Sequence, residues 1–203
     1  MISKSVTLTD PAETSPKNKP LLTGEELVAA DDLGSGELIE GVFIEMTPPG
    51  YWHGVIEFNI GGILREFVNK HNLGYVLGGE AGVYTARNPD TVRGMDVAFI
   101  SHERMAQVQS TSYLDVAPEL IVEILSPGDR WHDVQDKLAE YFAIDVQVVW
   151  VADPKRKQLH VYQTVTEVEI LTAADTLSGG GVLAGFEVPV ANLFGQGGPR
   201  RNK

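Results

Sequence analysis

The segment Leu120-Ile121-Val122-Glu123-Ile124-Leu125 is a run of branched apolar residues that contains a single carboxylate. Pro118 precedes the run and Ser126-Pro127-Gly128 follows it, so its length and bounds predict a β-strand covered on both faces. An unpaired carboxylate buried in such a strand would cost on the order of several kcal/mol. The sequence therefore predicts that Glu123 is either neutralised or has a cation close to it.

The composition limits the possible classes of protein. The chain has 203 residues, which favours one domain with a sizeable core. Its net charge of −12 weighs against strong non-specific binding to nucleic acid, although a local groove or a bound metal could offset the acid. The absence of cysteine excludes disulfides, zinc–cysteine sites and thiol catalysis.

The two ends of the chain differ from its middle. Residues 1–20 are polar and contain three prolines, and residues 195–203 also lack an apolar pattern, so we expect flexible tails around a single domain over 21–194. The first residues have no apolar core of signal-peptide length. No segment approaches the roughly 20 apolar residues that a membrane helix needs. We therefore expect a cytoplasmic protein that does not contact a membrane.

The apolar periodicity predicts an α/β fold in which helices flank a mixed sheet. The expected helices cover 23–30, 53–69 and 130–143. The expected strands cover 75–77, 82–85, 95–100, 119–125, 146–152, 159–162 and 168–171, with a hairpin over 37–46 and a closing segment over 186–194. Because a strand–helix–strand step needs a crossover, the central sheet should be mixed, with an added N-terminal helix and hairpin and C-terminal β-hairpins.

A second carboxylate, Asp96, lies directly before the apolar segment Val97-Ala98-Phe99-Ile100, at the expected start of a strand. If this strand pairs with that of Glu123, the two carboxylates converge on one hard divalent cation. Magnesium suits such a site, because it binds through one or two carboxylates, several waters and substrate phosphate oxygens. The ion would polarise a phosphate and lower the pKa of an attacking water. Asp96 and Glu123 are thus the predicted ligands of Mg, for which Mn is the expected substitute.

Lys137 completes the candidate catalytic set. At roughly 100° per residue, it lies at the edge of the helix face formed by Val134, Leu138 and Tyr141. From there an ammonium group can lean over the edge of the sheet, orient a nucleophilic water and stabilise charge on a phosphate. An Asp, a Glu and a Lys brought together in this way are sufficient for metal-assisted hydrolysis of a phosphodiester.

Each of these residues also has a purely structural interpretation. Asp96 could be a turn or cap residue, and Glu123 could form a structural ion pair with a buried Arg or Lys. Lys137 could be solvated and pair with Asp133 at i,i+4, which is worth about 0.3–0.5 kcal/mol. His53, at the start of the first long helix, could donate toward the same site, or could be a helix cap or a surface residue.

Three further acids lie next to glycines and have two interpretations each. They could contact the residues that bind the metal without binding it themselves, or they could be solvated turn residues. They are Glu37, Glu40 and Glu80.

Several spaced motifs together resemble one family. The sequence is similar to the Uma family of restriction endonucleases, which belongs to the PD-(D/E)XK nuclease superfamily. The similarity extends from about Leu22 to Phe194, and the segments that carry it are 38–41, 95–97, 117–127, 136–141, 148–154 and 185–189.

The resemblance implies a restriction-endonuclease-like core, a magnesium-dependent site and cleavage of DNA. It assigns the metal-binding Asp to Asp96, the Glu to Glu123 and the Lys to Lys137. The superfamily more often places the lysine two residues after the Glu, where this chain has Leu125. The family's lysine is instead expected on the following helix.

Two smaller departures from the family's pattern are visible. Met95 stands where a proline commonly precedes the Asp, which should matter little for coordination. Asp145 stands where a glycine is usual before the last apolar strand, so that turn is expected to differ.

Two functions of different classes follow. The leading hypothesis is a metal-dependent DNA endonuclease, expected as a homodimer because cutting both strands of a duplex calls for two sites. The alternative is a non-catalytic, dimeric binding or regulatory module in which the same charges form a buried structural network. A nuclease for RNA or another phosphodiester is a third possibility.

Overall fold

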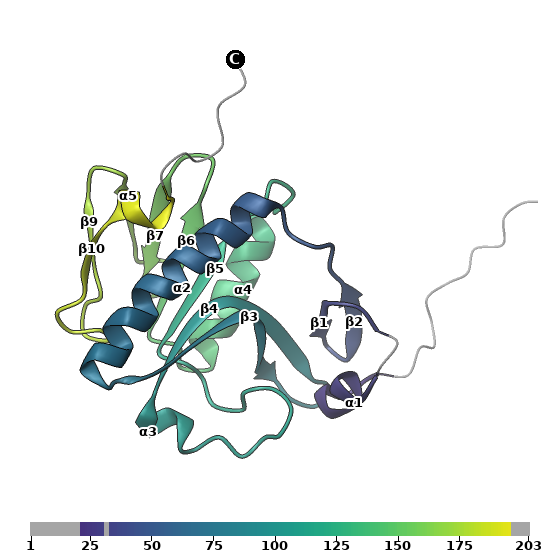
Figure 1. The fold of residues 1–203 in the computed structure, drawn as a ribbon. Coiled ribbons are helices and arrows are strands. Elements are labelled where there is room, and N and C mark those ends of the chain that lie inside the picture. Colours follow the sequence, from purple (N-terminus) through teal and green to yellow (C-terminus); the bar gives the residue numbers. More distant parts are fainter. Residues whose placement is uncertain (1–20, 31–32, 196–203) are drawn as a thin grey trace, which may run out of the picture.

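A central eight-stranded sheet organises the computed structural model, which describes residues 21–30 and 33–195. The strands of this sheet are β1 (Gly36–Ile39), β2 (Val42–Glu45), β3 (Gly74–Ala86), β4 (Thr91–Ser101), β5 (Leu120–Ile124), β6 (Val148–Asp153), β7 (Gln158–Tyr162) and β8 (Val168–Thr172). Their order is β2-β1-β4-β5-β6-β7-β8, with β3 paired to β4 (Figure 1). The pair β5–β6 is parallel and the other pairs are antiparallel, which confirms the predicted mixed sheet.

The predicted tails over 1–20 and 195–203 lie outside the described residues, apart from Gly195, and the division of the chain into tails and one domain stays a prediction. A small second sheet pairs β9 (Thr176–Ser178) with β10 (Glu187–Pro189). Within the described ranges, no helix is both long enough and apolar enough to cross a membrane.

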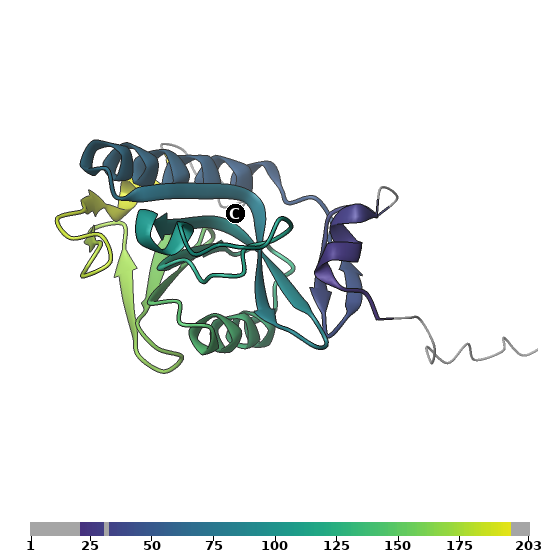
Figure 2. The same ribbon diagram turned by 90° about the horizontal axis from the view of Figure 1, so that it is seen from below.

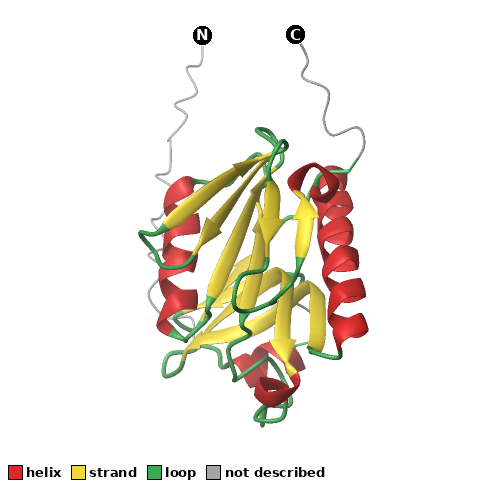
Figure 3. Cartoon of the chain, turned by 90° about the vertical axis from the view of Figure 1, so that its left-hand side faces the viewer, coloured by secondary structure: helices red, strands yellow, loops and turns green. Residues whose placement is uncertain are grey.

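Two long helices cover opposite faces of the central sheet. They are α2 (Tyr51–His71) and α4 (Trp131–Ala143), and Figures 2 and 3 show the strands between them. Three short helices complete the described fold: α1 (Gly24–Ala29), α3 (His102–Met105) and α5 (Val190–Leu193). Thr23 and Glu26 form a capping box at the start of α1. The predicted helices are thus confirmed, and α3 and α5 are additional short helices.

The strand β5 is covered on both faces, as its apolar run predicts. Leu120, Val122 and Ile124 belong to the apolar cluster that includes α2, while Ile121 belongs to the cluster that includes α4. Because side chains alternate along a strand, Glu123 shares the α4 face with Ile121. The fold therefore directs this carboxylate toward the helix that carries the predicted lysine.

The strand β4 has two different neighbours on one of its edges. One edge of β4 pairs along its whole length with β3, from Gly74↔Ser101 to Ala86↔Thr91. The remaining edge is shared, because β1 pairs at Val92 and β5 pairs from Val97 onward. Residues 93–96 of β4 consequently form no ladder pair on this edge, although the end of β5 lies beside Asp96. This gap between β1 and β5 is the place where the candidate site forms.

Two predicted strand assignments were wrong in detail. The segments 75–77 and 82–85 are one continuous strand, β3, whose register shifts between Gly78 and Ala81. Asp96 does not begin a strand, because β4 already starts at Thr91. Polar residues such as Thr91 and Arg93 are accommodated in this strand by buried partners, which a pattern of apolar residues alone does not reveal.

The turn before β6 adopts a conformation that glycine would favour. Asp145, which replaces the expected glycine, has φ +76, in the left-handed region. Arg104 contacts it through Nη2, at 3.0 Å from Asp145 Oδ2, and through Nη1, at 3.0 Å from its carbonyl oxygen. Asp145 thus adopts the left-handed conformation that glycine favours and forms an ion pair with Arg104.

Truncating the largest buried side chain should strongly destabilise the fold. Trp150 is 1% exposed and stacks on Phe186, so we expect Trp150→Ala to lower the free energy of unfolding by about 3–5 kcal/mol. Phe58→Ala, at a position that is 83% exposed, is the matched control and should change it by less than about 0.5 kcal/mol. Urea denaturation measures both. Equal losses in the two variants would contradict this packing.

His160 should make the stability depend on pH. Burial holds the pKa of this histidine below its ordinary 6.5, and its Nε2 atom is buried without a hydrogen-bond partner among the described residues. The unfolded chain therefore binds the proton first, so the wild type should lose stability relative to His160→Phe as the pH falls through 6.5. Urea denaturation between pH 5.5 and 8 measures this difference, and parallel curves for the two proteins would refute it.

Candidate functional site

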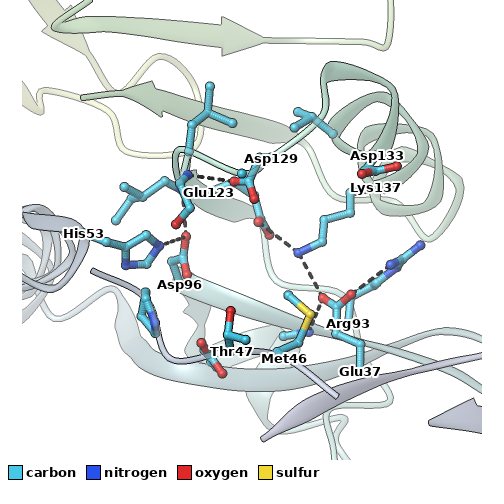
Figure 4. A pocket seen from close by; sticks show the side chains of 18 of the residues that line it. Glu37, Met46, Thr47, His53, Arg93, Asp96, Glu123, Asp129, Asp133 and Lys137 are labelled. Atoms are coloured by element: carbon cyan, nitrogen blue, oxygen red, sulfur yellow. Dashed lines mark hydrogen bonds and ion pairs between the residues drawn. The ribbon is translucent and has the colours of Figure 1, made fainter. Parts of the chain in front are cut away.

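The two predicted ligands lie next to each other on neighbouring strands. The register Val97↔Val122 makes Asp96 and Glu123 the next opposed pair of β4 and β5. In such antiparallel pairs the Cβ atoms are about 4.5–5.5 Å apart. Both side chains are largely buried, with 12% and 14% exposed, and both line one pocket of about 670 Å³ (Figure 4). The structure thus places Asp96 beside Glu123, as expected for shared ligands.

Asp96 is held by the backbone and by His53. The amide of Ile124 donates to Asp96 Oδ2 at 2.6 Å, and His53 Nε2 lies 3.2 Å from the same oxygen. Burial would lower the pKa of His53, but the hydrogen bond and the charge of Asp96 outweigh burial and raise it. Because its ring is buried and directed at Asp96, His53 is not a surface residue. It fixes one oxygen of this carboxylate.

Glu123 is surrounded by donors from α4. Lys137 Nζ lies 3.1 Å from its Oε2, and the Tyr141 hydroxyl donates to Oε1 at 2.7 Å. Burial raises the pKa of Glu123 to about 7; Lys137 and Tyr141 oppose this rise, and the negative charge of Asp96 adds to it. An ionised Glu123 is therefore energetically costly here, and any additional positive charge nearby reduces that cost.

Lys137 pairs with two carboxylates from different parts of the chain. In addition to Glu123, its ammonium contacts Glu37 Oε1 at 2.9 Å. Burial alone would lower the pKa of Lys137, but these two carboxylates outweigh it and raise the pKa. These pairs replace the i,i+4 pair with Asp133 that the structural interpretation offered. Lys137 is consequently fixed at the site as a cation.

Glu37 belongs to an ion-pair network that includes Arg93 and Glu140. Arg93 Nη1 donates to Glu37 Oε2 at 2.9 Å, and Arg93 Nε donates to Glu140 Oε2 at 2.7 Å. The amide of Gly94 also donates to Glu37, at 3.2 Å. Burial would raise the pKa of Glu37, but Lys137 and Arg93 outweigh it and lower the pKa. Of the three acids with two interpretations, Glu37 therefore contacts the predicted catalytic lysine.

The other two acids both have a left-handed backbone conformation. Glu40 has φ +49 in the hairpin between β1 and β2, and Glu80 has φ +59 in the bulge of β3. Glu80 lines the pocket. Glu40 is exposed in a turn, which matches its turn interpretation, whereas Glu80 lies within a strand at the pocket, where its charge contributes to the raised pKa of His53.

The pocket is acidic beyond its central residues. Glu80, Asp129, Asp133 and Asp136 also line it. Across the part of the chain that the structure describes, no group of three or more potential ligand residues is arranged to hold a metal ion. A cation at Asp96 and Glu123 would therefore complete its coordination with water or substrate oxygens, which is the arrangement magnesium favours.

Comparison with known proteins identifies the family of this chain. A family model, Uma2, described as "Putative restriction endonuclease", matches residues 26–191. The chain belongs to the Uma2 family. This finding confirms the resemblance that the sequence motifs indicated.

A solved structure shares the fold of this Uma2 chain. It is described as "a putative nuclease belonging to DUF820" from Anabaena variabilis ATCC 29413. The two chains are 18% identical with a TM-score of 0.71, and the match covers 85% of this chain and 97% of that chain. The search of curated proteins gave no match.

Sequence reasoning missed several residues of the hydrogen-bond and ion-pair network around Asp96, Glu123 and Lys137. Tyr141 was assigned only to the apolar helix face, although its position four residues after Lys137 places both on one side of α4. Arg93 was not used, although it is a cation close to Asp96 within a strand that is otherwise mainly apolar. Glu140, which pairs with Arg93, carries no comparable signal, because a helix carboxylate is usually solvated.

Removing the Tyr141 hydroxyl should leave Glu123 short of a donor. At pH 8.5, where Glu123 is ionised, we expect Tyr141→Phe to lower the free energy of unfolding by about 1.5–3 kcal/mol, because the bond involves a charged group. Tyr162→Phe is the control, since this buried tyrosine has no side-chain hydrogen bond to the described residues. Urea denaturation compares the two variants, and equal stabilities would show that Glu123 does not depend on Tyr141.

Proposed function

We propose that this Uma2 chain is a magnesium-dependent endonuclease that hydrolyses DNA phosphodiester bonds. The observation that carries the proposal is the side-by-side placement of Asp96 and Glu123 on β4 and β5, with the Lys137 ammonium 3.1 Å from Glu123. Membership of the family supports a nuclease. Nucleic acid, magnesium and the roles of individual residues are our inferences.

The donor set fits a hard cation. Carboxylate oxygens are the ligands that magnesium prefers, and two of them converge on the pocket. One oxygen of Asp96 is occupied by Ile124 and His53, whereas Oδ1 accepts no hydrogen bond from the described residues. A magnesium ion bound there would supply the charge that polarises a scissile phosphate and lowers the pKa of an attacking water.

Residues of the chain would orient the water, stabilise charge on the phosphate and hold the two metal ligands in place. Lys137 has three N–H donors, of which two contact Glu37 and Glu123. The third is available to orient a water or to stabilise negative charge on the phosphate. His53 keeps Asp96 in place, and Tyr141 does the same for Glu123.

The acidity of the pocket makes DNA binding dependent on the metal. The carboxylates around the pocket repel phosphate, and Arg93 and Lys137 are already paired with acids. A divalent cation would reverse the local potential and allow a phosphate to approach. The net charge of −12 is thereby compatible with a nuclease whose contact with DNA is local. Cleavage of both strands would use two copies of the chain, so we propose a homodimer.

Cleavage assays test the proposal. Purified protein is incubated with supercoiled, linear and branched DNA, and with RNA, in magnesium or manganese. We expect metal-dependent cleavage of DNA that falls at least roughly 100-fold in Asp96→Asn, Glu123→Gln and Lys137→Met, because each variant removes a charge that the reaction needs. Asp133→Asn, at a pocket acid that does not pair with Lys137, is the control and should cut normally. Unchanged cleavage in Glu123→Gln and Lys137→Met would refute the proposed roles.

A non-catalytic module remains the second candidate, and one observation favours it. Glu123, Lys137, Glu37, Arg93 and Glu140 form a continuous, largely buried ion-pair network in which each acid is paired with Lys137 or Arg93. If the network is only structural, magnesium should leave the melting temperature unchanged. If the chain is a metal-dependent nuclease, magnesium should raise the melting temperature of the wild type and not that of Asp96→Asn.

A further inference from the structure

Glu37 lies far from Glu123 in sequence and close to it in the fold. It lies on β1, which follows β5 along the same edge of β4, and its side chain is only 9% exposed. The N-terminal hairpin thus places a carboxylate at the gap in which Asp96 and Glu123 lie.

The contacts of Glu37 argue against its being a metal ligand. Its Oε1 accepts from Lys137 at 2.9 Å and from the amide of Gly94 at 3.2 Å, while its Oε2 accepts from Arg93 at 2.9 Å. Both oxygens are therefore engaged by donors, and two of these donors are cations. Such a carboxylate is suited to holding another side chain in place.

Lys137 needs such a partner for a physical reason. A lysine has a flexible four-carbon stem, and its position is defined only by the groups that its ammonium contacts. Of the two carboxylates that hold it, Glu123 is the one that would also bind the cation. A lysine paired with Glu123 alone would compete with the metal for that carboxylate.

We propose that Glu37 is a positioning residue that anchors Lys137 beside the site independently of Glu123. Lys137 then keeps its place when Glu123 binds the metal, and the β1–β2 hairpin becomes part of the catalytic apparatus. This inference rests on the proposed nuclease function for its effect on turnover, while the anchoring itself is a property of the folded chain.

The chain offers a matched control in Glu140. Glu37 and Glu140 both pair with Arg93. Glu37 also contacts Lys137, whereas Glu140 forms no ion pair with Lys137 in the described part of the chain. Both Glu37→Gln and Glu140→Gln break an ion pair of Arg93, so both should lower the melting temperature. A role confined to stability would make the two variants alike in every other respect.

The turnover number kcat should distinguish Glu37→Gln from Glu140→Gln. We expect Glu37→Gln to lower kcat by roughly 10- to 100-fold with little change in KM, because the reacting groups are misplaced rather than lost. Glu140→Gln should keep nearly full kcat. In the Lys137→Met background, Glu37→Gln should cause no further loss, since its effect passes through Lys137. Additive losses in that double variant, or equal kcat in the two Gln variants, would overturn the proposal.

A measurement without catalysis keeps the two proposals distinguishable. An ammonium held by two carboxylates exchanges its protons slowly, so the ¹⁵Nζ signal of Lys137 should be visible by NMR in the wild type and in Glu140→Gln, and absent in Glu37→Gln and Glu37→Asp. Lys137→Met identifies the signal. If the signal persists in both Glu37 variants, the anchoring role is wrong even if the wild type cuts DNA. If the wild type cuts no substrate but the signal depends on Glu37, the nuclease proposal fails and the anchoring stands.

Discussion

The shared edge of β4 is the constraint on which the site depends. Where β1 ends and β5 has not yet begun, the backbone of β4 has no ladder partner on that side. Buried backbone groups need partners, and side chains provide them here: Glu37 accepts from the amide of Gly94 in β4, and Asp96 accepts from the amide of Ile124 at the end of β5. The same gap that interrupts the sheet therefore orients two acidic side chains, and it opens the pocket between the hairpin and α4.

The charges gathered at this gap do not balance. Among the described residues, Glu37, Glu123 and Glu140 pair with two cations, Arg93 and Lys137. Asp96 adds a further carboxylate with His53 as its partner. A buried ionic network of this kind is weak evidence for stability, because desolvation offsets much of the attraction. A surplus of negative charge around an open pocket instead fits the divalent cation that we propose for Asp96 and Glu123.

Some of this site could be predicted from local sequence patterns, and some could not. The apolar run around Glu123 and the helix that carries Lys137 were predicted correctly, because both follow from periodicity within a short segment. The position of the hairpin against β4 is a long-range pairing with no local signal, so the role of Glu37 stayed open. Asp96 was placed at a strand start for a related reason: a polar residue inside a strand is tolerated only through partners that the sequence does not reveal.

The placement of the lysine explains why the hairpin matters. A lysine two residues after Glu123 would stand on the same strand face and be fixed by the sheet, but Leu125 occupies that position. Lys137 reaches Glu123 instead from α4, across the space between helix and sheet, through a stem with considerable rotamer freedom. A second contact to the ammonium therefore fixes its position more than it would for a lysine carried by the strand itself. Glu37 makes that contact from the opposite side of the gap, which links the first strand of the sheet to the helix-borne lysine.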